Sequence, residues 1–299
     1  MASPKIISVA GGKGGIGKSI IAANVAVTMA NRGYRVVAVD LDLGASNLHA
    51  FLGVKNSGRN ILNFAERSDV ELDSMVLPTR FKGAGLICGA ANVAGAANIG
   101  VQEKARIIDN LSTLTADYVI LDLGAGSSFN VTDFFLVGNQ GIIVIVPEIT
   151  SLLDAYSFLK STLHRHLQLE WKSVPEVASI ILEFKNPNNP RRIVTVEQLI
   201  KAVQHVSLNE AQRMRRLIQS FEVKVVLNKV RNQKDFQVVK TIKELSHKNL
   251  SLAVHDAGYI PYDTEVSRSV NQMTPFVHLA PRRPATRQID KLCREIVQA

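Results

Sequence analysis

The first residues of the chain that could carry out chemistry form a glycine-rich loop at positions 11–19. The loop reads Gly-Gly-Lys-Gly-Gly-Ile-Gly-Lys-Ser and contains the spacing Gly-x-x-x-x-Gly-Lys-Ser. Glycines at this spacing let successive backbone N–H groups turn inward and hold phosphate oxygens. Lys18 is placed to reach β- and γ-phosphates, and the Ser19 hydroxyl to bind Mg²⁺. The predicted phosphate-binding residues are Gly12, Lys13, Gly14, Gly15, Ile16, Gly17, Lys18, Ser19 and Ile20.

Acidic residues follow two later apolar segments. Asp40 and Asp42 stand at the end of the strand-like run 35–40, and Asp122 ends the apolar run 118–122. Two carboxylates two residues apart at a strand end point the same way and suit different tasks around one Mg²⁺–phosphate centre. A carboxylate after a buried strand supplies a hard oxygen near the metal. We therefore expect Ser19, Asp40 and Asp122 to be the metal ligands.

Alternating strands and helices are needed to bring these residues together. The chain repeats a strand–loop–helix rhythm, with a helical pattern from 20 to 31 after the glycine loop. Continuous apolar runs are typical of strands buried on both faces of a parallel sheet. The pattern predicts an α/β fold with an open, doubly wound, mostly parallel sheet and ligands beyond the carboxyl ends of its strands. The remaining predicted strands are 5–10, 85–88, 141–146, 223–227 and 252–260, and the remaining helices are 101–114, 151–163 and 236–245.

One segment interrupts this rhythm. Residues 164–220 exceed what one crossover helix needs, and a turn-rich break lies at 184–190. Capping-box patterns at 195–198 and 207–210 predict two helices. Because the segment is rich in arginine and lysine, we interpret it as a basic helical insertion. It is either a surface that binds a partner or a solvent-exposed segment with no binding role. At the other end, residues 282–299 form an amphipathic helix, which can dock on the core or lie on a membrane.

Bulk properties limit the class of protein. The 299 residues are 46% hydrophobic and 20% charged, with a net charge of +9. This charge favours an anionic partner such as a membrane surface, nucleic acid or an acidic protein. Two cysteines, Cys88 and Cys293, predict neither a disulfide framework nor a metal cluster. No apolar run approaches a membrane span and no signal-peptide pattern is present, so we expect a cytoplasmic protein.

The loop lysine Lys13 and the motifs above resemble the deviant-Walker-A ATPases of the MinD/ParA class. The resemblance implies a single P-loop ATPase domain over residues 1–299, with Mg²⁺ and ATP as cofactors, although residue chemistry alone leaves GTP open. It implies that Lys13 reaches the nucleotide of a facing subunit in an ATP-dependent homodimer. The run 40–48 is similar to the family's switch I, and 122–126 to its switch II. On that match Asp40 holds Mg²⁺-bound water, Asp42 activates the attacking water, and Asn47 closes the dimer face.

Two later segments match the family's base-binding motifs. Asn228 follows a strand, and the run 257–263 is similar to Gly-x-Ile-Pro-x-Asp, so the resemblance places Asn228 and Pro261 against adenine. The implied catalytic residues are Lys13, Lys18 and Asp42.

The run Pro-Glu-Ile-Thr-Ser-Leu-Leu-Asp-Ala-Tyr at 147–156 resembles FlhG-type proteins (also called FleN or YlxH), regulators of flagellar number and placement. This resemblance implies an FlhF-type GTPase and flagellar C-ring proteins as partners, and peripheral membrane contact. We expect low intrinsic ATPase activity, because a dimerising switch gains from a long-lived bound state. A ParA-type ATPase that binds nonspecific DNA is the alternative. A metabolic relative of the nitrogenase iron-protein type would need paired cluster cysteines, and an amidase or ligase would need a substrate pocket that the sequence does not reveal.

Overall fold

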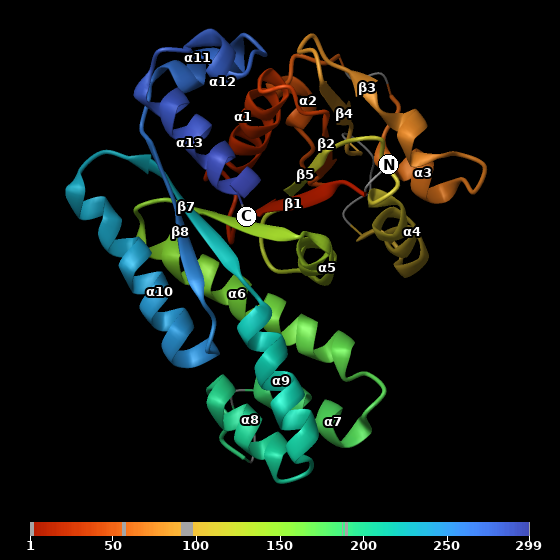
Figure 1. Ribbon diagram of the computed structural model, residues 1–299, viewed down its shortest axis with the longest axis vertical. Coiled ribbons are helices and arrows are strands. Elements are labelled where there is room, and N and C mark those ends of the chain that lie inside the picture. Colours follow the sequence, from red (N-terminus) through yellow and green to blue (C-terminus); the bar gives the residue numbers. More distant parts are fainter. Residues whose placement is uncertain (1–2, 56–57, 91–97, 187, 189–190, 299) are drawn as a thin grey trace.

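An eight-stranded sheet forms the centre of the computed structural model in Figure 1, which describes residues 3–55, 58–90, 98–186, 188 and 191–298. The predicted break at 184–190 lies partly outside these residues. The strand order is β3-β4-β2-β5-β1-β6-β7-β8, and only β3 runs antiparallel to its neighbour. This arrangement confirms the predicted doubly wound, mostly parallel α/β fold. The strands are β1 Lys5–Ala10, β2 Val36–Leu41, β3 Leu77–Pro78, β4 Ala84–Ile87, β5 Tyr118–Leu123, β6 Gln140–Ile145, β7 Val223–Val230 and β8 Val254–Pro261.

Helices cover both faces of the sheet, which explains why the central strands are continuously apolar. All six residues of β5 are buried, because alternate side chains enter two separate hydrophobic clusters. One cluster lies under α1, α2, α12 and α13, and the other under α3–α10. The helices are α1 Lys18–Asn31, α2 Leu48–Phe51, α3 Ile61–Glu66, α4 Val101–Leu111, α5 Phe129–Val137, α6 Ile149–Glu170, α7 Pro175–Lys185, α8 Val196–Gln204, α9 Leu208–Ser220, α10 Gln237–Leu250, α11 Glu265–Asn271, α12 Phe276–Leu279 and α13 Pro284–Gln298, with 3₁₀ turns η1 Leu72–Met75 and η3 Gln233–Phe236.

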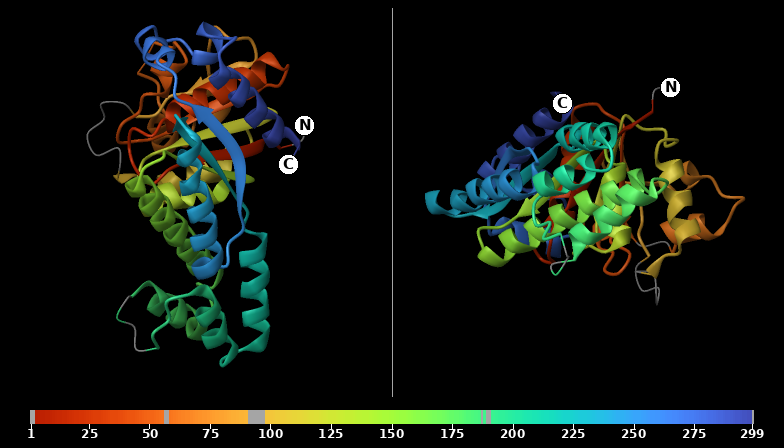
Figure 2. Two further views of the ribbon diagram at one scale, coloured as in Figure 1. Left: turned by 90° about the vertical axis from the view of Figure 1, so that its left-hand side faces the viewer. Right: turned by 90° about the horizontal axis from the view of Figure 1, so that it is seen from below.

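Helices α7, α8 and α9 project from one end of the molecule, at the far end of α6 (Figures 1 and 2). Helix α6 continues to Glu170, so the predicted start of the insertion at 164 lies inside this helix. Two helices were predicted in the segment, and α7 is a third. It begins with Pro175 at its first turn, where a missing N–H costs nothing. The buried Trp171 and the apolar faces of α7–α9 belong to the same cluster as the core face of α6.

The caps of this projecting unit differ from each other. Thr195 forms the predicted reciprocal capping box with Gln198. Ser207 caps α9 by accepting from the Glu210 N–H, but the Glu210 carboxylate does not return to the cap. Instead its Oε2 accepts from the Trp171 indole N–H at 2.6 Å, because the buried indole needs an acceptor. The second capping box is therefore only half formed, because the Glu210 carboxylate binds Trp171 instead of the N-cap backbone.

The C-terminal helix α13 lies beside α1 on the same side of the sheet (Figure 1). Its apolar side is buried against α1 and β8 through Ala285, Ile289, Leu292, Cys293 and Ile296. Of the two alternatives for this helix, the structure has the docked one. Across the ranges described above, no helix has the length and apolar character of a membrane span.

Candidate nucleotide-binding site

The glycine loop joins the central strand β1 to the buried helix α1. Strand β1 ends at Ala10 and α1 begins at Lys18, so the loop lies at the carboxyl edge of the sheet and at a helix N-terminus. Gly17 is the N-cap of α1 with φ +98°, a conformation that favours glycine. A Cβ there would also lie 2.4 Å from the Asn228 amide nitrogen. Gly12 has no room either, since its Cβ would lie 2.3 Å from the Asp154 carbonyl carbon in α6.

The two loop lysines make different contacts within one subunit. Lys18 is buried, and its ammonium donates to the Lys13 carbonyl at 3.5 Å across the loop. The Lys13 ammonium leaves the loop and lies against the start of α6, where it donates to Glu148 Oε2 at 2.6 Å and Thr150 Oγ1 at 2.9 Å. Lys13 holds the pKa of Glu148 below its usual range by this hydrogen bond and by its charge. Lys13 is thus positioned on an outer face rather than toward Lys18.

The carboxylate of Asp40 is fully buried and organises the chain after β2. Its Oδ1 accepts from the Asp42 N–H at 3.1 Å, and its Oδ2 accepts from the Ser46 hydroxyl at 2.6 Å and the Leu48 N–H at 3.0 Å. Burial raises the pKa of Asp40 to about 6, although these three hydrogen bonds favour the charged form. Both oxygens are therefore already engaged in shaping the loop 42–48.

Asp122 lies beside Asp40, because β2 and β5 pair in register at these two residues. It is completely buried, and among the described residues neither of its oxygens has a hydrogen-bond partner. Burial raises the pKa of Asp122 well above its usual range, and the charge of Asp40 raises it further. The Ser19 hydroxyl and the Lys18 ammonium are close enough to oppose this rise, but Ser19 does not complete a hydrogen bond.

This unpaired carboxylate fits a divalent cation. A buried acid without a partner is costly, and a hard cation with oxygen ligands would satisfy it. Ser19, at the start of α1, supplies a second oxygen beside it. One carboxylate and one hydroxyl are a donor set that fits Mg²⁺, which takes one or two protein ligands and keeps phosphate and water for the rest.

Asp42 and Asn47 lie on the outer side of this carboxylate pair. Asp42 is half-buried, with Oδ1 accepting from the Ala45 N–H at 3.1 Å. A Cβ on Gly124, in the loop after β5, would approach the same Oδ1 at 3.3 Å. Asn47 is exposed, and its amide donates to the Ala45 carbonyl at 2.8 Å. Asp42 thus borders both predicted switch loops, while Asn47 is on the surface.

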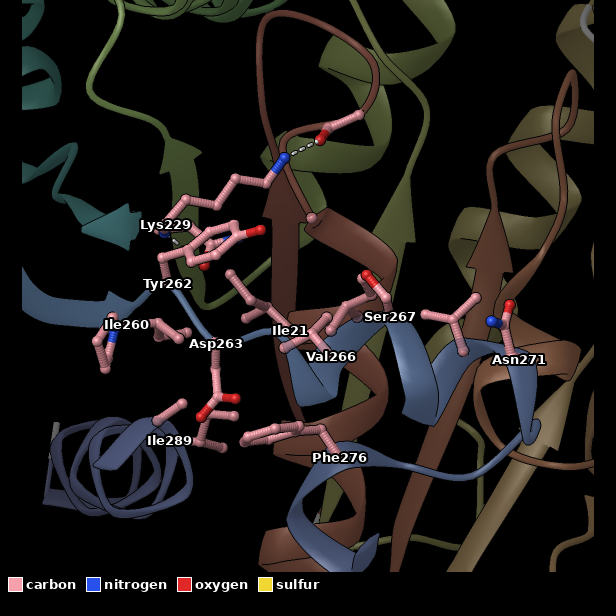
Figure 3. Close-up of a pocket in the computed structure, with 17 residues that line it drawn as sticks. Ile21, Lys229, Ile260, Tyr262, Asp263, Val266, Ser267, Asn271, Phe276 and Ile289 are labelled. Carbon is pink, nitrogen blue, oxygen red and sulfur yellow. Dashed lines mark hydrogen bonds between the residues drawn. The ribbon is translucent and has the colours of Figure 1, made fainter. Parts of the chain in front are cut away.

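A pocket of about 390 Å³ adjoins the loop on the side of β7 and β8 (Figure 3). Its walls come from the loop, α1, the ends of β7 and β8, and α11–α13. Most of the wall is apolar, with Ile21, Val266, Phe276 and Ile289 among its side chains. Such a pocket suits a flat, largely apolar group held by a few polar atoms. Five of the predicted site residues line it, namely Gly15, Gly17, Ile20, Asn228 and Pro261.

The site therefore has two regions that meet at the glycine loop. The apolar pocket lies on one side, and the carboxylates Asp40, Asp42 and Asp122 follow the strands on the other. Lys13 and Asn47 belong to neither region, because the partly exposed Lys13 side chain lies against the start of α6 and Asn47 is exposed. This is the shape that a nucleoside triphosphate with a bound cation requires.

Several residues at the site had no assigned role from sequence. Glu148 and Thr150 hold Lys13, and Lys229 donates to the Gly15 carbonyl at 2.8 Å. Glu148 and Thr150 belong to a segment that was used only as a family signature. Because Lys229 follows Asn228 in a strand, regular alternation would have placed it on the opposite face.

Comparison with known proteins places this site in context. A sequence profile of the CobQ/CobB/MinD/ParA nucleotide binding domain matches residues 7–276. The septum site-determining protein MinD of Helicobacter pylori is 33% identical over 151 residues, which are 50% of this chain and 56% of that protein. The flagellum site-determining protein YlxH of the same organism is 32% identical over 158 residues, which are 52% of this chain and 53% of that protein. The antiactivator FleN of Pseudomonas aeruginosa is 27% identical over 206 residues, which are 68% of this chain and 72% of that protein.

Solved structures show the same fold. MinD of Pyrococcus horikoshii, solved as a complex with Mg-ADP, superposes with a TM-score of 0.66 at 21% identity and covers 98% of this chain and 96% of its own. A ParA family ATPase of Chlorobium tepidum superposes with a TM-score of 0.63 at 18% identity, and the match covers 98% of this chain and 99% of that one. By sequence, the chain spans about half the length of the MinD relatives it matches.

Proposed function

Because the chain belongs to the CobQ/CobB/MinD/ParA nucleotide-binding family, we propose that it is an ATP-dependent dimerising switch. ATP with Mg²⁺ joins two subunits face to face, and hydrolysis to ADP and phosphate separates them. The observation that carries this proposal is the position of Lys13. Its ammonium is held on the outer face by Glu148 and Thr150, away from the phosphate loop that it belongs to. A lysine in that place can serve the nucleotide of a second subunit.

The surface around Lys13 supports a subunit contact. Ile149 and Leu153, on the first turns of α6, expose 74% and 54% of their surface. Exposed apolar side chains beside a charged cluster are typical of a surface that a partner covers. Asn47 is exposed as well, as a residue that closes a dimer face should be. We infer that the second copy of this chain covers this face when ATP is bound.

Within each subunit, different residues bind the phosphates, the base, the metal and the attacking water. The glycine loop and Lys18 bind the phosphates, and the apolar pocket with Asn228 and Pro261 takes the base. Ser19 and Asp122 would hold Mg²⁺, with Asp40 shaping the adjacent loop, and the metal would neutralise charge on the phosphate oxygens. Asp42 orients the attacking water, since it is the half-exposed carboxylate of the group. We expect slow turnover that a partner accelerates.

The cellular task that we propose is the placement or number of a surface machine, most specifically the flagellum. The similarity to YlxH and FleN supports it. An FlhF-type GTPase and flagellar C-ring proteins are the partners to test. A solved complex of MinC with MinD from Aquifex aeolicus gives a precedent on this fold for a bound partner protein. Because α13 is docked, contact with a membrane would require this helix to leave the core.

The test is the oligomeric state of Lys13→Ala. With a non-hydrolysable ATP analogue and Mg²⁺, sedimentation should show dimers of the wild type and monomers of the variant, while both bind nucleotide. Asp42→Ala should form dimers with ATP itself that persist, because hydrolysis no longer separates them. Lys13→Ala dimers equal to the wild type would refute the cross-subunit role.

A ParA-type DNA-binding ATPase is the second candidate, and the exposed lysines of α10 favour it. Lys240, Lys243 and Lys248 are exposed on this helix, and among the described residues the ion pair of this group is Lys240 with Glu244 at 3.9 Å. In the insertion, Arg191, Arg213 and Arg215 are each paired with glutamates, so part of its positive charge is neutralised. Binding of ATP-loaded protein to random DNA, lost steeply with added salt, would favour this candidate.

The metabolic alternative receives no support from the cysteines. Cys88 and Cys293 are both buried and free. The Cys88 thiol lies near Asp40, whereas the Cys293 thiol donates to the Val25 carbonyl at 3.8 Å. A cluster of the nitrogenase iron-protein type needs paired cysteines as ligands.

A further inference from the structure

Strand β7 carries an irregularity where it meets the glycine loop. Its pairing with β8 shifts register between Leu227 and Val230, and Lys229 has φ +61°. A residue with a side chain adopts this conformation only at a cost, and bulges beside active sites commonly redirect a side chain. In a regular strand, Asn228 and Lys229 would point to opposite faces. Here both reach the same loop, as Figure 3 shows for Lys229.

The two residues hold consecutive carbonyl groups of the loop. The Asn228 amide donates to the Ile16 carbonyl at 2.7 Å, and the Lys229 ammonium donates to the Gly15 carbonyl at 2.8 Å. The Asn228 side-chain oxygen accepts from the Lys229 N–H at 2.9 Å, which stabilises the bulge itself. Together they form a two-point clamp between β7 and the phosphate loop.

This clamp also connects the two regions of the site. Asn228 and Lys229 both line the apolar pocket, while the carbonyls they hold belong to the segment that cradles phosphate. With one amide N–H used by Ile16 and the oxygen engaged by Lys229, Asn228 keeps one N–H and one lone pair for a base. A loop whose carbonyls are drawn outward turns its N–H groups toward an anion. The ammonium also adds positive charge beside that anion.

From this geometry we infer that Lys229 is a positioning residue for the triphosphate: it holds the glycine loop in its phosphate-binding shape and couples that shape to the base pocket. The inference rests on the proposed nucleotide-binding function. It does not depend on dimerisation, because every contact of the clamp lies within one subunit. Lys229 also lies near the Lys13–Glu148 pair. The charges of both lysines lower the pKa of the Glu148 carboxyl, and the effect of Lys13 is the stronger one.

Lys229→Met tests the charge, because it keeps a long side chain and removes the ammonium. We expect its dissociation constant for a fluorescent ATP analogue to rise by about tenfold, the size of one charge-assisted hydrogen bond. The loss should be smaller for the AMP analogue, because fewer phosphates use the loop. KM should rise while kcat changes little, and Lys229→Arg should restore most of the affinity.

Lys229→Gly tests whether Lys229 acts on ATP binding or on the folding of the chain. Its matched control is Ser251→Gly. Ser251 also has a left-handed backbone, φ +53°, but caps α10 away from the site. Both glycine variants should melt at or above the wild-type temperature without nucleotide, since glycine adopts this backbone freely. Only Lys229→Gly should lose ATP affinity.

Two results would overturn the inference. One is Lys229→Met with wild-type affinity for ATP. The other is a loss of affinity that follows a fall in nucleotide-free melting temperature and that Lys229→Arg does not restore, which would mean a purely structural role. Failure of the switch proposal is distinguishable, because it would appear as unchanged dimers of Lys13→Ala whatever the Lys229 variants do.

Discussion

Asp122→Asn should stabilise the protein in the absence of Mg²⁺ and nucleotide, although it removes a residue of the site. The wild-type carboxyl is completely buried, has no hydrogen-bond partner among the described residues and faces Asp40 across paired strands. Its pKa is raised well above the usual value, chiefly by burial. The folded chain therefore keeps a proton that the unfolded chain releases above about pH 4. Stability must fall as pH rises from the unfolded pKa toward the folded one.

The size of the effect follows from linkage. One such group changes the free energy of unfolding by up to about 1.4 kcal/mol for each pH unit within that interval. For a chain of this size that slope corresponds to about 3 °C in melting temperature for each pH unit, and about pH 5.5 and about pH 7.5 are two values at which to compare the proteins. Asp40, with a pKa of about 6, adds to the slope only at the lower end of this range.

Thermal melts in EDTA at the two pH values provide the measurement. The wild type should lose several degrees on going to the higher pH, and Asp122→Asn should lose much less and melt above the wild type there. With Mg²⁺ and an ATP analogue the order should reverse, because the variant lacks the carboxylate that fits the metal. Asp117→Asn, just before β5, is the control. Asp117 accepts two hydrogen bonds from Arg35, which lower its pKa, so its loss should destabilise at both pH values.

The reasoning would be refuted if Asp122→Asn melted below the wild type in EDTA at the higher pH with an unchanged pH slope. That result would mean that the Asp122 carboxylate is satisfied in the metal-free protein.

Other predictions follow from contacts elsewhere in the structure. Asp133→Ala should reduce the free energy of unfolding in urea by about 3–5 kcal/mol, because it leaves Lys104 and Arg165 facing each other without their shared buried carboxylate; a loss below about 1 kcal/mol would contradict this. Gly17→Ala should lower ATP affinity by at least about tenfold in a fluorescence titration, since its Cβ would displace the Asn228 amide and strain the N-cap. A chain cut before Arg282 should be digested by protease far faster than the full chain, because the face covered by α13 would be exposed; equal digestion rates would show that α13 is dispensable for folding.

The fold and the phosphate loop could be predicted from sequence because their signals are local. The apolar runs of β5 and β6 indicate burial on both faces, and nine consecutive residues define the loop chemistry. The position of Asp40 and Asp122 at the carboxyl edge of the sheet also follows from sequence, but the strand order that makes β2 and β5 neighbours does not. The predicted family and α/β fold are confirmed. The roles of the site residues, and the division of the chain into one domain with a basic insertion at 164–220, stay predictions.

What tertiary structure decided is which distant groups meet. Lys13 contacts Glu148 across 135 positions, and Asn228 contacts Ile16 across 212. Strand alternation predicts that Lys229 points away from the loop, and the bulge with positive φ reverses this. Glu210 completes a hydrogen bond with Trp171 instead of a capping box.

These differences share one physical reason. Residue spacing and propensity act over a few positions, where the geometry of a strand, turn or helix fixes the neighbours in advance. The partner of a charged or polar side chain depends instead on how helices and strands pack, since packing decides which donors and acceptors lose their water. The sequence by itself determined a phosphate loop at the edge of a parallel sheet. Packing alone decided that Lys13 is held by the start of α6, that Asp122 has no hydrogen-bond partner among the described residues, and that β7 clamps the loop.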